Sequence, residues 1–377
     1  GPASSGGPLP CAAPSTAPGI TDDEIAVATI NTLSGPVPGL GASHLAATQA
    51  YAAYRNATGG VCGRRIRVVA ADDGADTARY RSIVEDLNRS TFALHAGIAA
   101  GGDGGAEPLA ANGIPAVGTG ITPLLIGSPT YYGVRPVVPD FNALVPKYRY
   151  LRDQGVRTAA VVFISAASSP VEAGQHAQMM EAAGIKVVLN QPLPLSTLSY
   201  DSAARAVANS KADYLFFLHD QGGSASMARS LVNAGYKPKF ADYIVAYGSK
   251  FIELAGPAAE GSTSFIDTLP AEDGGVVPEH KAFLEWMERI APQSVIDPFA
   301  ALGWAGAKAM FDTLEELPGP IDRAAYLTQL AAVGTYDAGG LLGPVEFGAQ
   351  QGRGCVIGMV VRDGKWQRLT PERGFLC

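Results

Sequence analysis

A glycine-rich turn near the N-terminus is the first segment whose residues could bind a ligand. The stretch ATINTLSGPVPGLGASH (28–44) passes from an apolar run into three glycines and then into a helical pattern. A P-loop would continue with Lys and Ser or Thr, but Gly41 is followed by Ala and Ser. A dinucleotide fingerprint would need a glycine where His44 stands. The turn therefore matches neither nucleotide motif. It could be a plain strand-to-helix connection that binds nothing, and a nucleotide-dependent Rossmann-like enzyme stays a less favoured alternative to a site for another small molecule.

The other reactive side chains form no recognised catalytic or metal-binding motif. The five histidines include no H-E-x-x-H pair, and the chain has no G-x-S-x-G elbow. The four cysteines form no C-x-x-C pair, and no histidine lies at metal-ligand spacing from any of them. We therefore expect no enzymatic activity, no cofactor and no bound metal.

Several loops that follow apolar runs carry polar groups suited to a small organic ligand. AAGGDGGAE (99–107) exposes backbone N–H groups beside a helix N-terminus, where hydrogen bonds and the helix dipole favour a carboxylate. GTGIT (118–122) adds two threonine hydroxyls. HDQGG (219–223) follows DYLFFL, at the carboxyl end of a predicted strand, where ligands of open α/β sheets bind. Asp220 could pair there with a ligand amine, and His219 could supply a hydrogen bond or be an ordinary loop histidine.

The four cysteines are read as two disulfides, with inert thiols buried in the core as the alternative. Two of them, Cys11 and Cys377, lie near the chain ends, where a thiol contributes little to packing but a disulfide can hold a terminal segment. Disulfides persist in oxidising compartments, so we expect an extracytoplasmic protein. Four cysteines allow three pairings. We predict Cys11 with Cys62 and Cys355 with Cys377, because each pair joins a terminal segment to a nearby element.

Length and charge narrow the class of protein further. A chain of 377 residues exceeds the size at which one hydrophobic core stops growing, so about two domains are expected. The net charge of -7 argues against a nucleic-acid partner, and no apolar stretch approaches the ~20 residues that span a bilayer. Residues 1–20 are rich in Pro, Gly, Ser and Ala and read as a flexible tail. Any signal segment or lipid anchor is expected to have been removed or to lie upstream of residue 1.

Short apolar runs alternate with helical patterns along most of the chain, which predicts parallel sheets covered by helices on both faces. The series pauses at 122–141 and then starts again. We therefore predict an α/β protein with two Rossmann-like doubly wound lobes, between which the chain crosses three times. The expected parts are a flexible tail at 1–21, a first lobe of 22–138 plus 264–340, and a second lobe of 139–263 plus 341–377.

The order of several motifs resembles the type I periplasmic binding proteins, above all the branched-chain amino-acid (Leu/Ile/Val) receptors of ABC transporters. LSGPVPGLG, GGVCGRRIRVVAADD and ANGIPAVGTGITP are similar to their early strands and loops. DPFAALGWAGAKAMFDTLEEL resembles the long helix that follows their second lobe, and GPVEF with the later RDGKW resembles their closing strands. The resemblance spans residues 22 to about 370 and implies three hinge strands, a ligand cleft between the lobes and no catalysis.

The resemblance also implies candidate ligand contacts by position. Leu40 stands where such receptors often carry an aromatic residue, and Ser169 where they often carry a tyrosine. Their carboxylate-binding loop has serines and threonines that glycines and Asp103 replace here, so Asp103 could instead cap the following helix. Tyr247 replaces an acid that pairs with the ligand ammonium, and Phe217 is expected to pack nearby. The full set of candidate ligand-binding residues is Leu40, Gly101, Gly102, Asp103, Gly104, Gly120, Thr122, Ser169, Phe217, His219, Asp220 and Tyr247.

Together these observations predict a solute-binding protein that closes two lobes around a small organic ligand. The ligand is expected to be an amino acid or a related carboxylate or amide, although the altered contacts disfavour a standard branched-chain amino acid. The expected partners are that ligand and an ABC transporter permease, and the protein is expected to be a monomer. A receptor domain that senses the ligand without transport is the main alternative.

Overall fold

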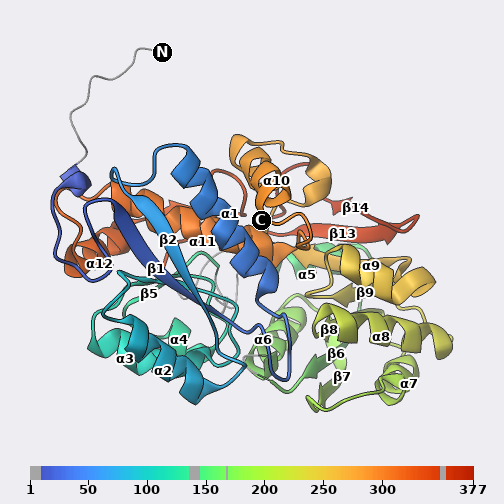
Figure 1. Ribbon diagram of the computed structural model, residues 1–377. Coiled ribbons are helices and arrows are strands. Elements are labelled where there is room, and N and C mark those ends of the chain that lie inside the picture. The colour runs from blue at the N-terminus through green and yellow to red at the C-terminus, as the bar shows by residue number, and fades with distance from the viewer. Residues whose placement is uncertain (1–9, 136–144, 167–168, 349–353) are drawn as a thin grey trace.

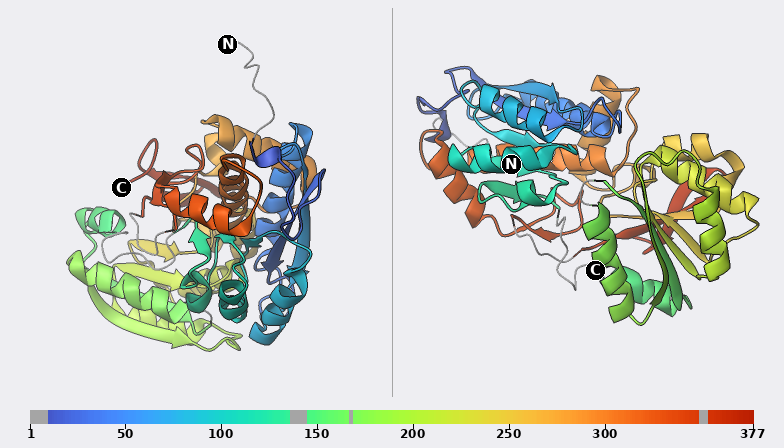
Figure 2. Two further views of the ribbon diagram at one scale, coloured as in Figure 1. Left: turned by 90° about the vertical axis from the view of Figure 1, so that its left-hand side faces the viewer. Right: turned by 90° about the horizontal axis from the view of Figure 1, so that it is seen from below.

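The protein is a two-lobed α/β structure, seen in a computed structural model that describes residues 10–135, 145–166, 169–348 and 354–377 (Figure 1). Each lobe contains one large sheet, and Figure 2 shows the two lobes side by side when the molecule is viewed from below. The predicted fold class is confirmed. None of the described helices is long and apolar enough to cross a membrane.

The first lobe is built on a five-stranded, fully parallel sheet with the order β2-β1-β3-β4-β5. Its strands are β1 (Glu24–Asn31), β2 (Arg65–Asp72), β3 (Leu94–Ala96), β4 (Ala116–Gly118) and β5 (Tyr131–Gly133). The helices that follow these strands are α1 (Ala42–Ala57), α2 (Thr77–Leu87), the 3-10 helix η2 (Gly102–Gly105), α3 (Ala106–Ala111) and α4 (Pro123–Ile126). Three later helices, α10 (Pro278–Ile290), α11 (Pro298–Glu315) and α12 (Arg323–Ala332), complete this lobe.

The strand β1 shows why the sheet is covered on both faces. Ile25 and Val27 lie in the core that contains α1 and α11, whereas Ala28 and Ile30 lie in the core that contains α2, α3 and α4. Side chains alternate between the faces of a strand, so a run that is apolar at every position needs helices on both sides. The sequence EIAVATIN therefore places β1 in the interior of the sheet.

The second lobe is built on a seven-stranded mixed sheet with the order β14-β13-β10-β9-β8-β6-β7. Its strands are β6 (Thr158–Ile164), β7 (Lys186–Leu193), β8 (Tyr214–Leu218), β9 (Phe240–Tyr243), β10 (Ser262–Ile266), β13 (Ile357–Arg362) and β14 (Lys365–Thr370). Its helices are α5 (Val145–Asp153), α6 (Ser169–Ala182), α7 (Asp201–Ser210), α8 (Gln221–Asn233), α9 (Ser249–Ala255) and the 3-10 helix η3 (Gly256–Ala259). The strands from β7 to β10 are parallel, and β13 and β14 add an antiparallel hairpin.

The chain passes between the lobes three times: after β5, after β10, and before β13. Because β10 pairs with β9 and β13, the second passage begins after Ile266, a few residues later than the sequence suggests. The second and third passages run beside each other, since Leu269 N–H donates to the Leu341 carbonyl and Gly343 N–H donates to the Asp267 carbonyl. Along them lie the 3-10 helix η4 (Ala271–Asp273) and a small sheet of β11 (Thr335–Tyr336) and β12 (Val345–Glu346).

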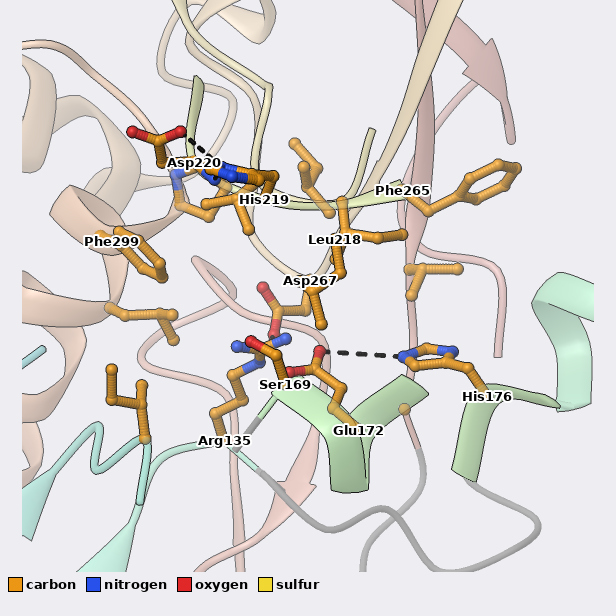
Figure 3. Close-up of a pocket in the computed structure, with 18 of the residues that line it drawn as sticks. Arg135, Ser169, Glu172, His176, Leu218, His219, Asp220, Phe265, Asp267 and Phe299 are labelled. Carbon is orange, nitrogen blue, oxygen red and sulfur yellow. Dashed lines mark hydrogen bonds and ion pairs between the residues drawn. The ribbon is translucent and has the colours of Figure 1, made fainter. Parts of the chain in front are cut away.

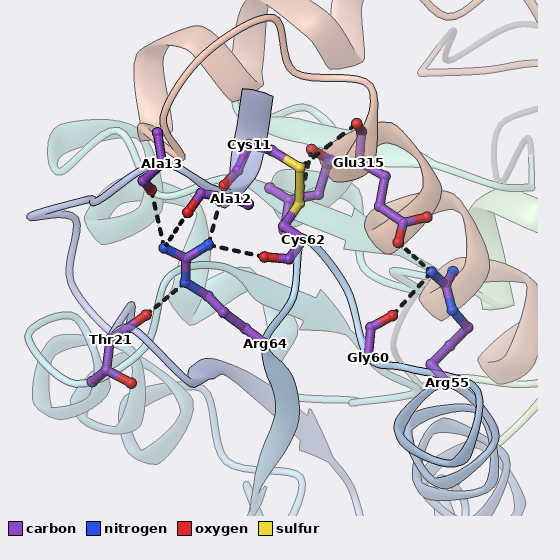
Figure 4. The surroundings of a disulfide bond; sticks show 10 residues. Cys11, Ala12, Ala13, Thr21, Arg55, Gly60, Cys62, Arg64 and Glu315 are labelled. Atoms are coloured by element: carbon purple, nitrogen blue, oxygen red, sulfur yellow. Dashed lines mark hydrogen bonds and ion pairs between the residues drawn. A yellow bond between two sulfur atoms is a disulfide. The ribbon is translucent and has the colours of Figure 1, made fainter. Parts of the chain in front are cut away.

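Both predicted disulfides are present, Cys11–Cys62 and Cys355–Cys377. The segment before β1 differs from the expected flexible tail, because residues 10–20 pack against the first lobe. Cys11, in the 3-10 helix η1 (Pro10–Ala12), is buried. The Arg64 guanidinium donates hydrogen bonds to several carbonyls of this segment, including those of Cys11 and Ala13 (Figure 4). The disulfide and Arg64 thus supply the stabilisation that the composition of this segment lacks.

Candidate functional site

A cavity of about 200 Å³ lies where the two lobes and the passages between them meet. The first lobe contributes a wall that is entirely apolar: Val37, Leu40, Ala100, Ile121, Pro298, Phe299 and Leu302. The second lobe and the passages supply further apolar residues, among them Leu218 and Phe265, together with the eight polar side chains of the described lining, most of which are labelled in Figure 3. The cavity therefore has an apolar side and a side that carries charge.

The topology explains why these residues meet. Val37 and Leu40 follow β1, Ala100 follows β3, and Ile121 follows β4. In the second lobe much of the lining comes from the residues at and after the ends of β6, β8, β9 and β10. The carboxyl ends of parallel strands meet at one edge of a sheet, and ligands of open α/β sheets bind outside that edge. Each lobe presents this edge to the other, so the cavity lies between them.

An ion pair between two passages lies on the polar side of the cavity. Arg135, just after β5, places Nε 2.8 Å from Oδ2 of Asp267, which follows β10. Burial lowers the pKa of Arg135, but the charges of Asp267 and Glu172 outweigh burial and raise it. The guanidinium is thus charged and joins the first passage to the second.

Glu172 and His176 lie one turn apart on α6 and face the same part of the cavity (Figure 3). His176 Nε2 is 3.8 Å from Glu172 Oε1, and Tyr148 Oη is 2.5 Å from His176 Nδ1. Burial raises the pKa of Glu172, but His176, Arg135 and Lys147 outweigh burial and hold it below its ordinary value. Burial lowers the pKa of His176 more than Glu172 raises it. At neutral pH the pair is therefore a carboxylate beside a neutral imidazole.

A second ion pair, Lys147 with Asp242, is buried behind the cavity wall. Lys147 Nζ is 2.7 Å from Asp242 Oδ2, and the two side chains are 2% and 0% exposed. Tyr214 donates a hydrogen bond of 2.5 Å to the same oxygen, and Lys147 Nζ lies 4.9 Å from the centre of the Phe265 ring. Although Lys147 reaches the lining, its charge is already balanced by a buried carboxylate.

Four of the residues proposed from the sequence line the cavity: Leu40, Ser169, His219 and Asp220. Asp220 caps α8, since the Gly223 N–H donates to its Oδ1, and His219 Nδ1 is 2.7 Å from the same oxygen. Burial raises the pKa of Asp220, but these hydrogen bonds outweigh it and hold the pKa below the ordinary range. Asp220 is therefore an ionised carboxylate at the cavity, with its side chain 51% exposed.

The remaining proposed residues of the first lobe do not line the cavity, and most have internal partners. The Gly101 N–H donates to Asp73, and the Gly120 N–H donates to the Tyr131 hydroxyl. Asp103 accepts a hydrogen bond from Leu124 N–H, so it contacts the start of α4 and not α3. The other three are Gly102, Gly104 and Thr122, of which Gly102 and Thr122 are buried.

Phe217 and Tyr247 of the second lobe also lie outside the lining. Phe217 is buried in the core and stacks on His219, with 5.9 Å between ring centres. The Tyr247 hydroxyl donates to Glu272 and accepts from Ala271 N–H. Phe217 therefore supports the cavity wall from behind through His219, whereas the hydroxyl of Tyr247 is engaged outside the lining.

The charged residues of the lining other than Asp220 were missed by sequence reasoning. Glu172 lies inside the loop and helix start AASSPVEAG that the sequence singles out, so attention to its acid could have found it. Arg135 and Lys147 lie in or just after the Pro-, Gly- and Tyr-dense stretch, which has no periodic pattern to place a side chain. Their roles follow from partners more than 90 positions away, Asp242 and Asp267, which no local pattern reveals.

Two lobes with parallel sheets, three passages and a cavity between facing strand ends define a two-lobed binding protein. The sequence model of the periplasmic binding protein family matches residues 24–365, and the chain belongs to this family, with the type I arrangement of the lobes. A search of curated protein sequences gives no significant match.

Solved structures of ABC transporter binding proteins share this fold. One is a fatty acid ABC transporter substrate-binding protein from Thermomonospora curvata, with 21% identity over 96% of this chain and 95% of that chain and a TM-score of 0.81. Another is LivJ from Streptococcus pneumoniae, a branched-chain amino acid transporter substrate-binding protein in complex with isoleucine (16% identity, 93% and 100% coverage, TM-score 0.77). A third is the leucine-binding protein LivK from Thermotoga maritima (14% identity, 92% and 98% coverage, TM-score 0.76). The chain is thus a solute-binding protein by family and fold.

Proposed function

We propose that this protein is the extracytoplasmic solute-binding component of an ABC importer, and that it closes its lobes around a small organic ligand. The observation that carries the proposal is the cavity itself, whose lining comes from both lobes and from the passages between them. A ligand in this position touches Phe299 of the first lobe and Leu218 of the second at the same time.

Closure follows from this shared lining. Contacts with both lobes exist together only when the lobes are closed, so the ligand stabilises the closed form by its difference in affinity for the two forms. The three passages are the places at which the angle between the lobes can change. A non-catalytic role agrees with a cavity in which Arg135 and Lys147 are held in ion pairs and Asp220 caps a helix.

The lining favours a ligand with an apolar body. Eighteen of the 28 described lining residues are apolar, including each of those from the first lobe. The similar structures are described as binding proteins for a fatty acid or a branched-chain amino acid, which are also ligands with apolar bodies. A ligand screen should therefore include amino acids, carboxylates and amides that carry an apolar body.

The compartment and the partner follow from the same proposal. Two disulfides are typical of proteins outside the cytoplasm, where they are not reduced. A binding protein of this kind delivers its ligand to a membrane permease, and one cavity per chain is enough for a monomer to do so.

The proposal can be tested by combining a thermal-shift screen with small-angle scattering. A ligand that binds only the native protein raises the melting temperature, and closure lowers the radius of gyration in the same sample. The variant Phe299→Ala should weaken both responses because it removes one wall of the cavity. The control variant Leu198→Ala changes a fully exposed side chain (98%) and should leave them intact. If amino acids, aliphatic and aromatic acids, amines and amides all leave both quantities unchanged, the proposal is wrong.

A further inference from the structure

Glu172 is an ionised carboxylate in the cavity wall that lacks a close partner. Its side chain is 17% exposed, and its nearest ion-pair contact, His176 Nε2 at 3.8 Å, lies beyond hydrogen-bond range. Its charge is stabilised by His176, at the far edge of hydrogen-bond reach, and by the more distant cations Arg135 and Lys147, so no described group donates a hydrogen bond of ordinary length to it. An ionised carboxylate has about four acceptor positions, and burying one without partners is costly. The carboxylate of Glu172 therefore needs a donor that the cavity's occupant can bring.

Among the residues that the structure describes, the charges around the cavity leave an excess of negative charge. Apart from the two histidines, the described lining holds three carboxylates, Glu172, Asp220 and Asp267, and two cations, Arg135 and Lys147. Lys147 is paired with Asp242, a fourth carboxylate just behind the wall. Arg135 is paired with Asp267. A ligand that brings one positive charge would reduce this imbalance, whereas an anionic ligand would increase it.

The apolar wall of the first lobe restricts where a charged group of the ligand can lie. No side chain of that wall, which includes Leu40 and Phe299, offers a hydrogen bond or a charge. The carboxylate of an amino acid would have to find its partner on the polar side, beside Glu172 and Asp267. A ligand with a single cationic head and an apolar body matches both sides of the cavity.

We propose that the ligand is an amphipathic amine, whose ammonium group binds Glu172 and whose apolar body lies against the wall formed by the first lobe. This inference rests on the proposed binding function and names the class of ligand. The ammonium group is a strong hydrogen-bond donor and meets Glu172 from the cavity, where Figure 3 shows this carboxylate beside Ser169 and Arg135. Asp220, more exposed and already engaged as a helix cap, makes a secondary contribution to the negative potential.

Isothermal titration calorimetry with ligands that share a body and differ in the head group tests this inference. Octylamine, octanol and octanoate form one set, and phenethylamine, phenethyl alcohol and phenylacetate form a second set with an aromatic body. At pH 7 the amines are cationic and the acids anionic. On at least one body the amine should bind at least about tenfold more tightly than the alcohol, since hydrogen bonds to charged groups are the stronger ones. The acid should bind more weakly than the alcohol.

The variant Glu172→Gln tests whether the tighter binding of the amine depends on the carboxylate of Glu172. Gln keeps the size of the side chain but removes its charge, so the advantage of the amine over the alcohol should largely disappear while alcohol binding persists. The control variant Glu181→Gln removes the same charge from an exposed position on the same helix and should leave the advantage intact. Melting curves of both variants check that they are folded. The comparison of amine, alcohol and acid on the unaltered protein tests the inference even if a variant does not fold.

Each of three results would overturn the inference. They are an acid that binds as tightly as the matched amine, an amine advantage that survives Glu172→Gln, and no amine binding on either body. The first of these, accompanied by a rise in melting temperature and closure in scattering, would leave the binding function standing. A lack of response to every ligand class in the broader screen would remove the binding function as well.

Discussion

Replacing Asp242 by asparagine should destabilise the second lobe strongly, because it leaves the ammonium group of Lys147 without its counter-charge. The two side chains are almost entirely removed from solvent, and their charged atoms are 2.7 Å apart. Asparagine has nearly the same shape as aspartate, so the change removes the charge and leaves the packing. Tyr214 can still donate a hydrogen bond to the remaining oxygen.

The size of the effect can be worked out from this geometry. At 2.7 Å and an effective dielectric constant of about 20, the attraction is roughly 6 kcal/mol before desolvation is considered. Breaking one partner out of a buried ion pair costs about 3–5 kcal/mol, because an uncompensated charge remains. The faces of Phe265 and of three further aromatic rings near Lys147 Nζ offset part of this loss. We therefore expect Asp242→Asn to lower the free energy of unfolding by about 3 kcal/mol, the lower end of that range.

Urea unfolding at pH 7, followed by circular dichroism, measures this loss as a change in the free energy of unfolding. The control Glu285→Gln breaks an exposed ion pair with Lys281, which should contribute less than about 1 kcal/mol. The double variant Lys147→Met with Asp242→Leu removes both charges and should recover much of the stability. If Asp242→Asn costs no more than Glu285→Gln, the buried pair does not stabilise the lobe and the reasoning is wrong.

Two further predictions concern the first lobe. Replacing Cys11 and Cys62 by serine should lower the free energy of unfolding by up to roughly 4 kcal/mol, because the disulfide closes a loop with a sequence separation of 51; an unchanged urea midpoint would contradict this. His95 is buried and its pKa is lowered by burial to about 3, so below pH 6.5 the unfolded chain binds a proton that the folded chain does not. Stability should therefore be fully present above pH 6.5 and fall by about 3 kcal/mol by pH 4.5 through this residue. His95→Gln should make urea midpoints measured across this range less sensitive to pH, and an unchanged sensitivity would show that His95 is not responsible.

The fold could be predicted from the sequence because it depends on local patterns. The run EIAVATIN is apolar at almost every position, and this alone requires helices on both faces of its sheet. The same logic places the strands that end at Ile164 and Leu218 inside the second sheet. The boundary near residue 264 was less accurate, because membership of β10 in the second sheet depends on its pairing with β9 and β13. Pairing between distant strands leaves no local signal.

The sequence could point to lining residues where a loop follows a predicted strand. His219 and Asp220 directly follow the strand DYLFFL and both reach the cavity, as do Leu40 and Ser169 in the segments after two other strands. Glu172 and Arg135 could not be ranked in the same way, because their importance lies in which charges face each other. Arg135 meets Asp267 across 132 positions of sequence, and only the folded chain shows that the nearest described partner of Glu172 is His176 at 3.8 Å.

The glycines after β3 show how one sequence pattern can serve two physical needs. A loop of exposed N–H groups at a helix start suits a carboxylate, which is why the sequence points to ligand binding there. In the folded chain a Cβ on Gly104 would lie 1.9 Å from the carbonyl oxygen of Thr77, so a larger residue could not fit against α2. The N–H of Gly101 is already bonded to Asp73. Close packing between η2 and α2 accounts for Gly104, and the side chains that the described first lobe presents to the cavity are apolar.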